Sequence, residues 1–339
     1  MKRILRIALR AIGILAAILL IAGAAAYLRF ADVPAIPATA DANPALPGQE
    51  VLGVRLHVQS FGAPDAPVII VLHGGPGGDH RSLLPLRALS DRYRVVFYDQ
   101  RGAGLSERVA DAALTLDDHV AELDALAKAH SPDRPVALVG HSWGAILAAA
   151  HLGLHPDRVS AAVLIEPGFL DGAGWRAFDA RARPLVADQW QTLRGLGALL
   201  ATGFRALHVT GPDGDARGDY FMGRMVAGFA NHPANPYHCP GEAFDSPGWR
   251  IGARAMQAVP RQSGPADMDA LAARLVAFPG PVLLMAGACN DWIGAPLQKR
   301  HLDLFTKARL VEIPKAGHDV VDDRPVAAIA AIRAFLDPG

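Results

Sequence analysis

The stretch VALVGHSWGAILAAAHLGLHP (136–156) joins a short apolar run to a longer apolar segment through a Gly-x-Ser-x-Gly turn. The run 136–140 is typical of a buried strand, and the segment after the turn is typical of a helix. A tight strand-to-helix turn needs glycine on both sides and leaves the serine hydroxyl exposed at the helix N-terminus, where developing negative charge is favoured. The pattern therefore predicts that Ser142 is a nucleophile.

Short apolar and β-branched runs alternate with amphipathic segments along the chain, which indicates an α/β fold. The runs are nearly continuously apolar, as in parallel strands that are covered on both faces. A helix is predicted over 115–129, where Thr115 can cap the first turn. Between 168 and 262 the rhythm stops, which predicts a lid inserted into one domain. The predicted strands are 68–72, 94–99, 136–140, 159–165, 281–287 and 308–314.

A glycine-rich loop, HGGPGG (73–78), follows the first of these strands. Glycine lets backbone N–H groups come close to a substrate oxygen, so Gly75 and the N–H of Trp143 are the predicted oxyanion donors. His73 is expected to brace this loop. Further on, Asp99 and Arg101 are expected to form a structural pair beneath the site.

A serine nucleophile needs a general base, and the base needs a carboxylate that orients it. His318 follows the last predicted strand and is the predicted base, late in the chain as the order Ser, Asp, His requires. Asp291 follows the strand 281–287 and is the predicted acid, with Glu166 on the neighbouring loop as the alternative.

The N-terminus carries a membrane signal. Lys2, Arg3, Arg6 and Arg10 precede the uncharged segment 11–28, which would rise roughly 27 Å as a helix, close to the hydrocarbon thickness of a bilayer. The basic flank predicts a cytoplasmic N-terminus and a membrane-anchored body outside the cytoplasm, periplasmic or extracellular. The alternative is a signal peptide that is cleaved to give a secreted protein.

These patterns divide the chain into an anchor or signal (1–30), a proline-rich linker (31–49), two parts of a core (50–167 and 263–339) and a lid (168–262).

Lys plus Arg and Asp plus Glu both total 33, so the net charge is zero and gives no reason to expect a nucleic-acid partner. Two cysteines without Cys-x-x-Cys spacing exclude zinc ribbons and iron–sulfur clusters. Cys239 and Cys289 are either one disulfide or two buried thiols.

Together HGGPGG (73–78), DQRGAGLS (99–106), GHSWGA (140–145) and AGHD (316–319) resemble the α/β-hydrolase superfamily, specifically its proline iminopeptidase branch. The resemblance implies an eight-stranded, mostly parallel sheet with a helical cap after the sixth strand. It also implies a triad of Ser142, Asp291 and His318, with no cofactor and no metal.

Two positions depart from the pattern of that branch. Family members that remove N-terminal proline commonly have a Trp-Glu pair in the cap, whereas this chain has Trp190-Gln191, so Glu242 and Asp245 are the predicted substitutes for binding a substrate ammonium group. Asp291 lies one residue beyond the common Gly-x-x-Asp spacing from Gly287.

The resulting hypothesis is a serine hydrolase that acts on small peptide, aminoacyl or amide substrates. A membrane-tethered carboxylesterase or lipase is the alternative. A binding scaffold without catalysis is a third hypothesis, and the sequence leaves the oligomeric state open.

Overall fold

The computed structural model describes residues 2–244 and 248–337. Its centre is an eight-stranded sheet in the order β1-β2-β4-β3-β5-β6-β7-β8. β2 pairs with β1 and β4 in antiparallel fashion, and the pairs from β4 through β8 are parallel. The strands are β1 (Gly48–Val51), β2 (Val54–Phe61), β3 (Val68–Leu72), β4 (Arg94–Tyr98), β5 (Val136–His141), β6 (Val159–Ile165), β7 (Val282–Gly287) and β8 (Ala308–Ile313).

The six strands predicted from apolar runs are all present within one or two residues of their predicted bounds. The helix predicted over 115–129 is α2 (Leu116–His130), and Thr115 caps it together with Asp118 in a reciprocal capping box. β1 and β2 were not predicted from the pattern, because they mix polar with apolar residues. β1 begins inside the predicted linker, and farther upstream the N–H of Ala40 donates to Leu105 O at 2.7 Å.

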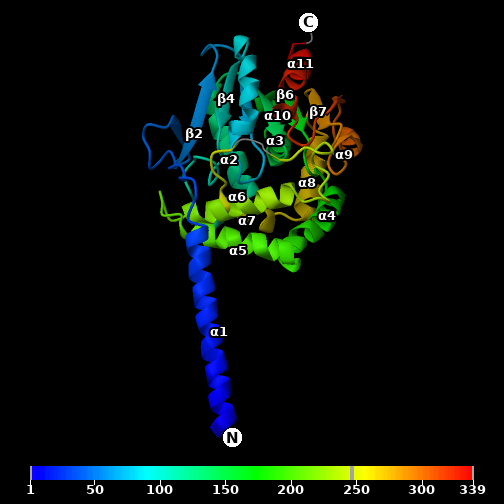
Figure 1. The fold of residues 1–339 in the computed structure, drawn as a ribbon. Helices are drawn as coiled ribbons and strands as arrows, with labels where there is room; N and C mark the ends of the chain where they lie inside the picture. The colour runs from blue at the N-terminus through cyan, green and yellow to red at the C-terminus, as the bar shows by residue number, and fades with distance from the viewer. Residues whose placement is uncertain (1, 245–247, 338–339) are drawn as a thin grey trace.

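Helices cover both faces of the sheet (Figure 1). One apolar cluster joins the sheet to α2, α3 (Trp143–Leu154) and α8 (Pro265–Leu275). The other face packs on η1 (His80–Asp91), α10 (Val320–Asp323) and α11 (Pro325–Leu336). The remaining elements on the core are α9 (Ala295–His301) and the short turns η2 (Asp111–Ala113), η3 (Pro156–Arg158) and η4 (Leu302–Leu304).

The chain between β6 and β7 forms a helical cap. It contains α4 (Gly172–Gln191), α5 (Leu193–Leu207), α6 (Ala216–Ala230) and α7 (Ala253–Arg261), all inside the lid predicted over 168–262. α8 then returns to the core and packs beside α3. Asp245 lies outside the described residues.

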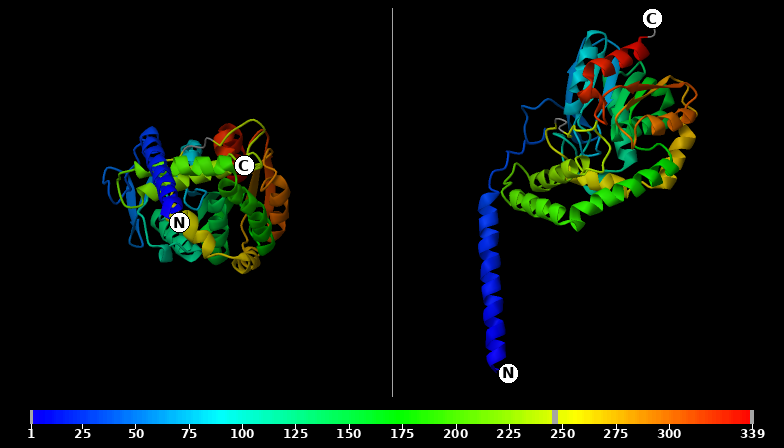
Figure 2. Two further views of the ribbon diagram at one scale, coloured as in Figure 1. Left: turned by 60° about the horizontal axis from the view of Figure 1, so that its bottom comes forward. Right: turned by 45° about the vertical axis from the view of Figure 1, so that its right-hand side comes forward.

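The N-terminal helix α1 (Lys2–Arg29) projects away from the rest of the molecule (Figures 1 and 2). Among the described residues it is the one helix long and apolar enough to cross a membrane, with a mean hydropathy of 2.4. Its side chains are exposed along nearly the whole length, and it meets the body only near its C-terminal end, beside α5.

Candidate active site

Ser142 occupies a strained turn between β5 and α3. Its φ of +54° is unusual for a residue with a side chain and is typical of a nucleophile elbow. A Cβ on Gly140 would strike the backbone of Gly144, and a Cβ on Gly144 would strike Leu72 O on β3. Both glycines are therefore required for the close approach of strand and helix, and they leave Ser142 partly exposed.

The predicted oxyanion loop lies directly against this turn. A Cβ on Gly74 would come within 3.1 Å of the Ser142 Cβ, and the φ of Gly75 is +134°, a conformation that favours glycine. Trp143 is the first residue of α3, so its N–H has no acceptor within the helix. The glycine-rich loop thus contacts the serine turn through Gly74, next to Gly75, and Trp143 directly follows the serine.

His73 braces this loop, as its sequence context suggested. Its Nε2 accepts from the N–H of Gln100 at 3.0 Å, and its Nδ1 donates to Gly74 O at 2.8 Å. The Gln100 side chain donates to His73 O and accepts from Trp143 Nε1 at 2.8 Å. Burial lowers the pKa of His73 to about 4, so the imidazole is neutral and holds the loop rather than transferring protons.

The carboxylate beside His318 is Glu166. His318 Nδ1 lies 2.7 Å from Glu166 Oε2, and both side chains are buried. Glu166 follows β6 directly, and its φ of +44° shows that the chain turns sharply there. The structure therefore places Glu166, the alternative, beside His318 in place of Asp291.

Asp291 is displaced from His318 because Asn290 takes the inward position. Asn290 Oδ1 accepts from the N–H groups of Trp292 and Ile293, which turns its Nδ2 toward Glu166 Oε2 at 2.7 Å. Asp291 is the next residue and is exposed. Its location explains why the sequence spacing from Gly287 was one residue too long.

The electrostatics of the pair suit a base and its orienting acid. Burial lowers the pKa of His318, against the opposing effect of Asp319 and Asp323, so the imidazole is neutral near pH 7. Burial raises the pKa of Glu166, whereas the N–H of Gly287 at 2.8 Å and the Asn290 amide stabilise its charged form. A carboxylate that accepts from its neighbours keeps the proton of His318 on Nδ1 and leaves Nε2 free to accept one.

Two further residues hold His318 in place, and the sequence pattern did not single them out for this role. His141 Nε2 donates to His318 O at 2.8 Å. From the cap, Tyr237 O accepts from the N–H of His318 at 2.7 Å, and the two rings stack with centroids 4.5 Å apart. The residue before Ser142 and a cap loop therefore both position the histidine.

A disulfide between Cys239 and Cys289 ties that cap loop to the loop after β7. Of the two alternatives left open by the sequence, the structure shows the bridged one. It joins the residue two positions after Tyr237 to the residue before Asn290. The disulfide therefore links the cap loop that contacts His318 to the loop whose Asn290 amide contacts Glu166.

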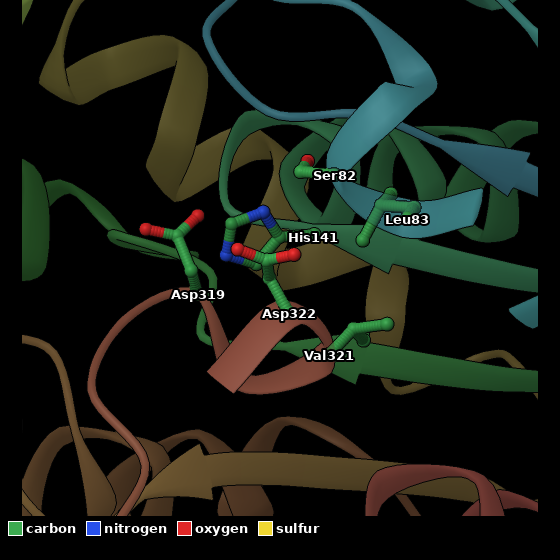
Figure 3. Close-up of a pocket in the computed structure, with 6 residues that line it drawn as sticks. All are labelled: Ser82, Leu83, His141, Asp319, Val321 and Asp322. Atoms are coloured by element: carbon green, nitrogen blue, oxygen red, sulfur yellow. The ribbon is translucent and has the colours of Figure 1, made fainter. Parts of the chain in front are cut away.

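Figure 3 shows the side chains that line a small space beside His141. It has no room for a water molecule, so it is not a substrate pocket. A larger groove of about 280 Å³ opens where α4 meets the start of α9, beside the stacked rings of Phe178 and Trp292. Trp292 also packs on Tyr237, so one aromatic cluster extends from this groove to His318. The small space is lined by Ser82, Leu83, His141, Asp319, Val321 and Asp322.

Of the two predicted ammonium-binding residues, Glu242 lies in the described part of the chain and Asp245 lies outside it. Glu242 is 46% exposed and lies 3.6 Å from the guanidinium of Arg324. It would have to leave this partner before it could bind a substrate amine.

Asp99 and Arg101 do not pair with each other, which corrects the expectation from the sequence. Asp99 accepts from His57 Nδ1 at 2.9 Å and from His80 Nδ1 at 2.7 Å, whereas Arg101 pairs with the buried Glu122 at 2.9 Å. Although burial raises the pKa of Asp99, the two imidazoles hold it well below its ordinary value. The His57, His80 and Asp99 ligand atoms lie close enough to surround a metal ion, but hydrogen bonds already account for their geometry.

Comparison with known proteins agrees with this fold. A family model described as the alpha/beta hydrolase fold matches residues 67–325. A proline iminopeptidase of Heyndrickxia coagulans is 41% identical over 124 residues, which is 35% of this chain and 41% of the relative. A putative carbamate hydrolase, RutD, of Cronobacter turicensis is 35% identical over 135 residues, or 39% of this chain and 50% of the relative. The chain thus matches half or less of the length of these curated relatives.

Two solved structures are similar in fold. A proline iminopeptidase-related protein from Thermus thermophilus has a TM-score of 0.58 at 21% identity, over 85% of this chain and 95% of its own. A membrane phospholipase A described as a bacterial virulence factor has a TM-score of 0.58 at 20% identity, over 100% of this chain and 99% of its own.

Proposed function

Because this chain belongs to the α/β-hydrolase fold family and is a proline iminopeptidase-like hydrolase, we propose that Ser142, His318 and Glu166 form its catalytic triad. Two observations carry the proposal. His318 Nδ1 lies 2.7 Å from Glu166 Oε2, and His141, the residue before the strained turn at Ser142, donates to His318 O at 2.8 Å.

The chemistry follows from the positions of these groups. His318 Nε2 takes the proton of Ser142 Oγ as this oxygen attacks the substrate carbonyl, and Glu166 stabilises the imidazolium that forms. The N–H groups of Gly75 and Trp143 are the proposed donors to the oxyanion. His318 then gives its proton to the leaving group, and a water molecule releases the acyl group from Ser142.

For the substrate, we propose carboxylic esters with an apolar acyl group. Aromatic rings from the cap and from the loop after β7 extend to His318: Tyr237 stacks on it, and Trp292 and Phe178 continue the same cluster. Glu242, the described cap carboxylate predicted to hold an ammonium group, is paired with Arg324 at the surface. Apolar rings gain from burying an acyl chain and offer no counter-ion to an amine.

Removal of an N-terminal residue from a peptide is the second candidate. The identity of 41% over 124 residues to a proline iminopeptidase favours it. That match covers 35% of the chain, so it supports shared catalytic machinery more directly than a shared substrate.

We further propose that α1 anchors the protein in a membrane and that the folded body lies on the outer side. The helix is long enough to span the hydrocarbon layer, and its basic residues precede the apolar segment. The solved membrane phospholipase A that aligns with the whole chain, α1 included, is consistent with an anchored ester hydrolase.

The test compares rates on four substrates with the full-length protein in detergent micelles. The substrates are nitrophenyl butyrate, nitrophenyl decanoate, and the nitroanilides of proline and alanine. We expect turnover of both esters, a preference for one acyl length, and loss of activity in Ser142→Ala. Faster cleavage of prolyl nitroanilide would establish the second candidate. No reaction of Ser142 with a fluorophosphonate in folded protein would refute the serine mechanism itself.

A further inference from the structure

The cap helix α5 (Leu193–Leu207) has an apolar side that faces solvent. Its leucines recur at helical spacing, and Leu193 is 91% and Leu200 56% exposed. The opposite side of the helix buries Thr202 and Ala206 inside the cap. Monomeric soluble proteins seldom expose such a contiguous apolar stripe. The exposed leucines of the stripe are Leu193, Leu196, Leu200 and Leu207.

The N-terminal helix meets α5 on this same side. Phe30, directly after α1, lies 6.4 Å from the ring of Phe204, which falls on the leucine side by helical spacing. His208 Nε2 donates to Tyr27 O at 2.8 Å. Figure 1 and the right-hand view of Figure 2 show α5 lying across the end of α1, at the edge of the body from which α1 projects. A bilayer crossed by α1 would therefore face α5.

The charges on α5 also suit a lipid surface. The helix contains Arg194 and Arg205 and no acidic residue. The guanidinium of Arg205 lies 4.7 Å from the centre of the Phe30 ring, close to the point where α1 leaves the body. An apolar stripe flanked by arginine is the pattern of a helix that lies in the plane of a membrane interface, with its cations near lipid phosphates.

We propose that the leucine side of α5 lies in the headgroup region of the bilayer that α1 spans, so that the cap rests on the membrane. This inference rests on the proposed anchoring by α1. A second copy of the chain is the competing occupant of the stripe. The stripe lies beside the end of α1, and α5 has no acidic residue. Both observations favour lipid as the occupant of the stripe.

The disulfide allows a direct test with full-length protein. Both cysteines are bonded to each other, so an introduced cysteine is the unique site for a thiol label. The Leu200→Cys variant is labelled with an NBD fluorophore at the new cysteine and is reconstituted into vesicles of phosphatidylethanolamine and phosphatidylglycerol. Val326→Cys on α11 is the matched control, because Val326 is also an apolar residue on a helix surface and is 83% exposed. Helix α11 lies at the opposite end of the body from α5 (Figure 1). Leu15→Cys reports on α1.

We expect NBD at positions 200 and 15 to emit at shorter wavelength than at position 326 and to be quenched by nitroxide-labelled lipids. Replacing Leu193 and Leu196 with Glu should reverse the shift at position 200 without altering ester turnover, because both side chains are exposed. Quenching at position 15 without quenching at position 200 would overturn the inference and leave the anchor intact. A shift at position 200 that lipid nitroxides do not quench, and that depends on protein concentration, would assign the stripe to a second copy. Loss of quenching at position 15 would overturn both proposals.

Discussion

Replacement of Glu166 by Gln tests the proposed triad most directly. The carboxylate of Glu166 contacts three donors: the N–H of Gly287 at 2.8 Å, the Nδ2 of Asn290 at 2.7 Å and the Nδ1 of His318 at 2.7 Å. Gln keeps the size of the side chain but replaces one acceptor oxygen with an NH2 group. Every neighbour of that group is a donor, so neither orientation of the amide satisfies all three contacts.

The expected loss follows from these two orientations. If the NH2 group faces Gly287, two donors oppose each other in a buried site, which costs about 1–3 kcal/mol of stability. If it faces His318, the imidazole must place its proton on Nε2, and the base is lost. Removal of the orienting carboxylate in a serine triad lowers kcat by about 10⁴-fold. We therefore expect kcat/KM to fall about 10³- to 10⁴-fold, equivalent to about 4–5.5 kcal/mol.

The assay is ester hydrolysis at pH 7.5, with thermal unfolding measured on the same samples to separate activity from folding. Asp291→Asn is the matched control, because it removes an exposed carboxylate from the loop after β7, which adjoins the loop of Glu166, and its kcat/KM should stay within about twofold of the parent. The double variant Glu166→Gln, Asn290→Asp should recover part of the activity, since it returns a carboxylate to the loop after β7. If Asp291→Asn loses activity and Glu166→Gln retains it, the assignment of Glu166 is refuted.

The remaining predictions concern pH and the disulfide. Because burial lowers the pKa of His318 and the base acts when neutral, kcat/KM should stay constant as the pH falls to about 6.5 and decline only below that value; a decline that begins above pH 7 contradicts the assignment. Cys239 and Cys289 are separated by 50 residues, so replacing both with Ala should lower the free energy of unfolding by up to about 4 kcal/mol. Chemical denaturation checks this, and an unchanged midpoint would show that the bridge does not restrain the unfolded chain.

The core strands could be predicted because each of them is a run of consecutive apolar residues. β3, for example, is buried at every position, so its sequence is apolar throughout. β1 is the edge strand of the sheet and β2 is its neighbour, and in β1 the half-buried Gln49 and the exposed Glu50 are polar. A mixed pattern over four to eight residues does not distinguish an edge strand from a loop.

The turn at Ser142 could also be predicted from consecutive residues, whereas the sequence left two candidates, Asp291 and Glu166, for the carboxylate beside His318. The elbow around Ser142 is local, but the acid is selected by contacts between loops that are far apart in sequence. β6 and β7 are adjacent and parallel, with Ile165 paired to Met285, so a carboxylate after either strand can reach the same imidazole. The signal that was available is Asn290 at the position where the resemblance expects Asp. An amide there donates to a carboxylate on the next strand, and Glu166 has the extra methylene that lets it reach.

The proposed orientation on the membrane also constrains how substrate arrives. The cap is inserted between β6 and β7, so it covers the carboxyl ends of the parallel strands, where Ser142, Glu166 and His318 lie. If α5 rests on the bilayer, the cap separates these residues from the lipid. Each layer of packed helices in the cap adds about 8–10 Å to this separation. Substrate would then approach from the side of the cap rather than through it. The aromatic cluster formed by Phe178 and Trp292 opens at that side, in the groove between α4 and α9. A bulky residue at Ala177, which also lines the groove, should therefore raise KM for decanoyl esters more than for butyryl esters.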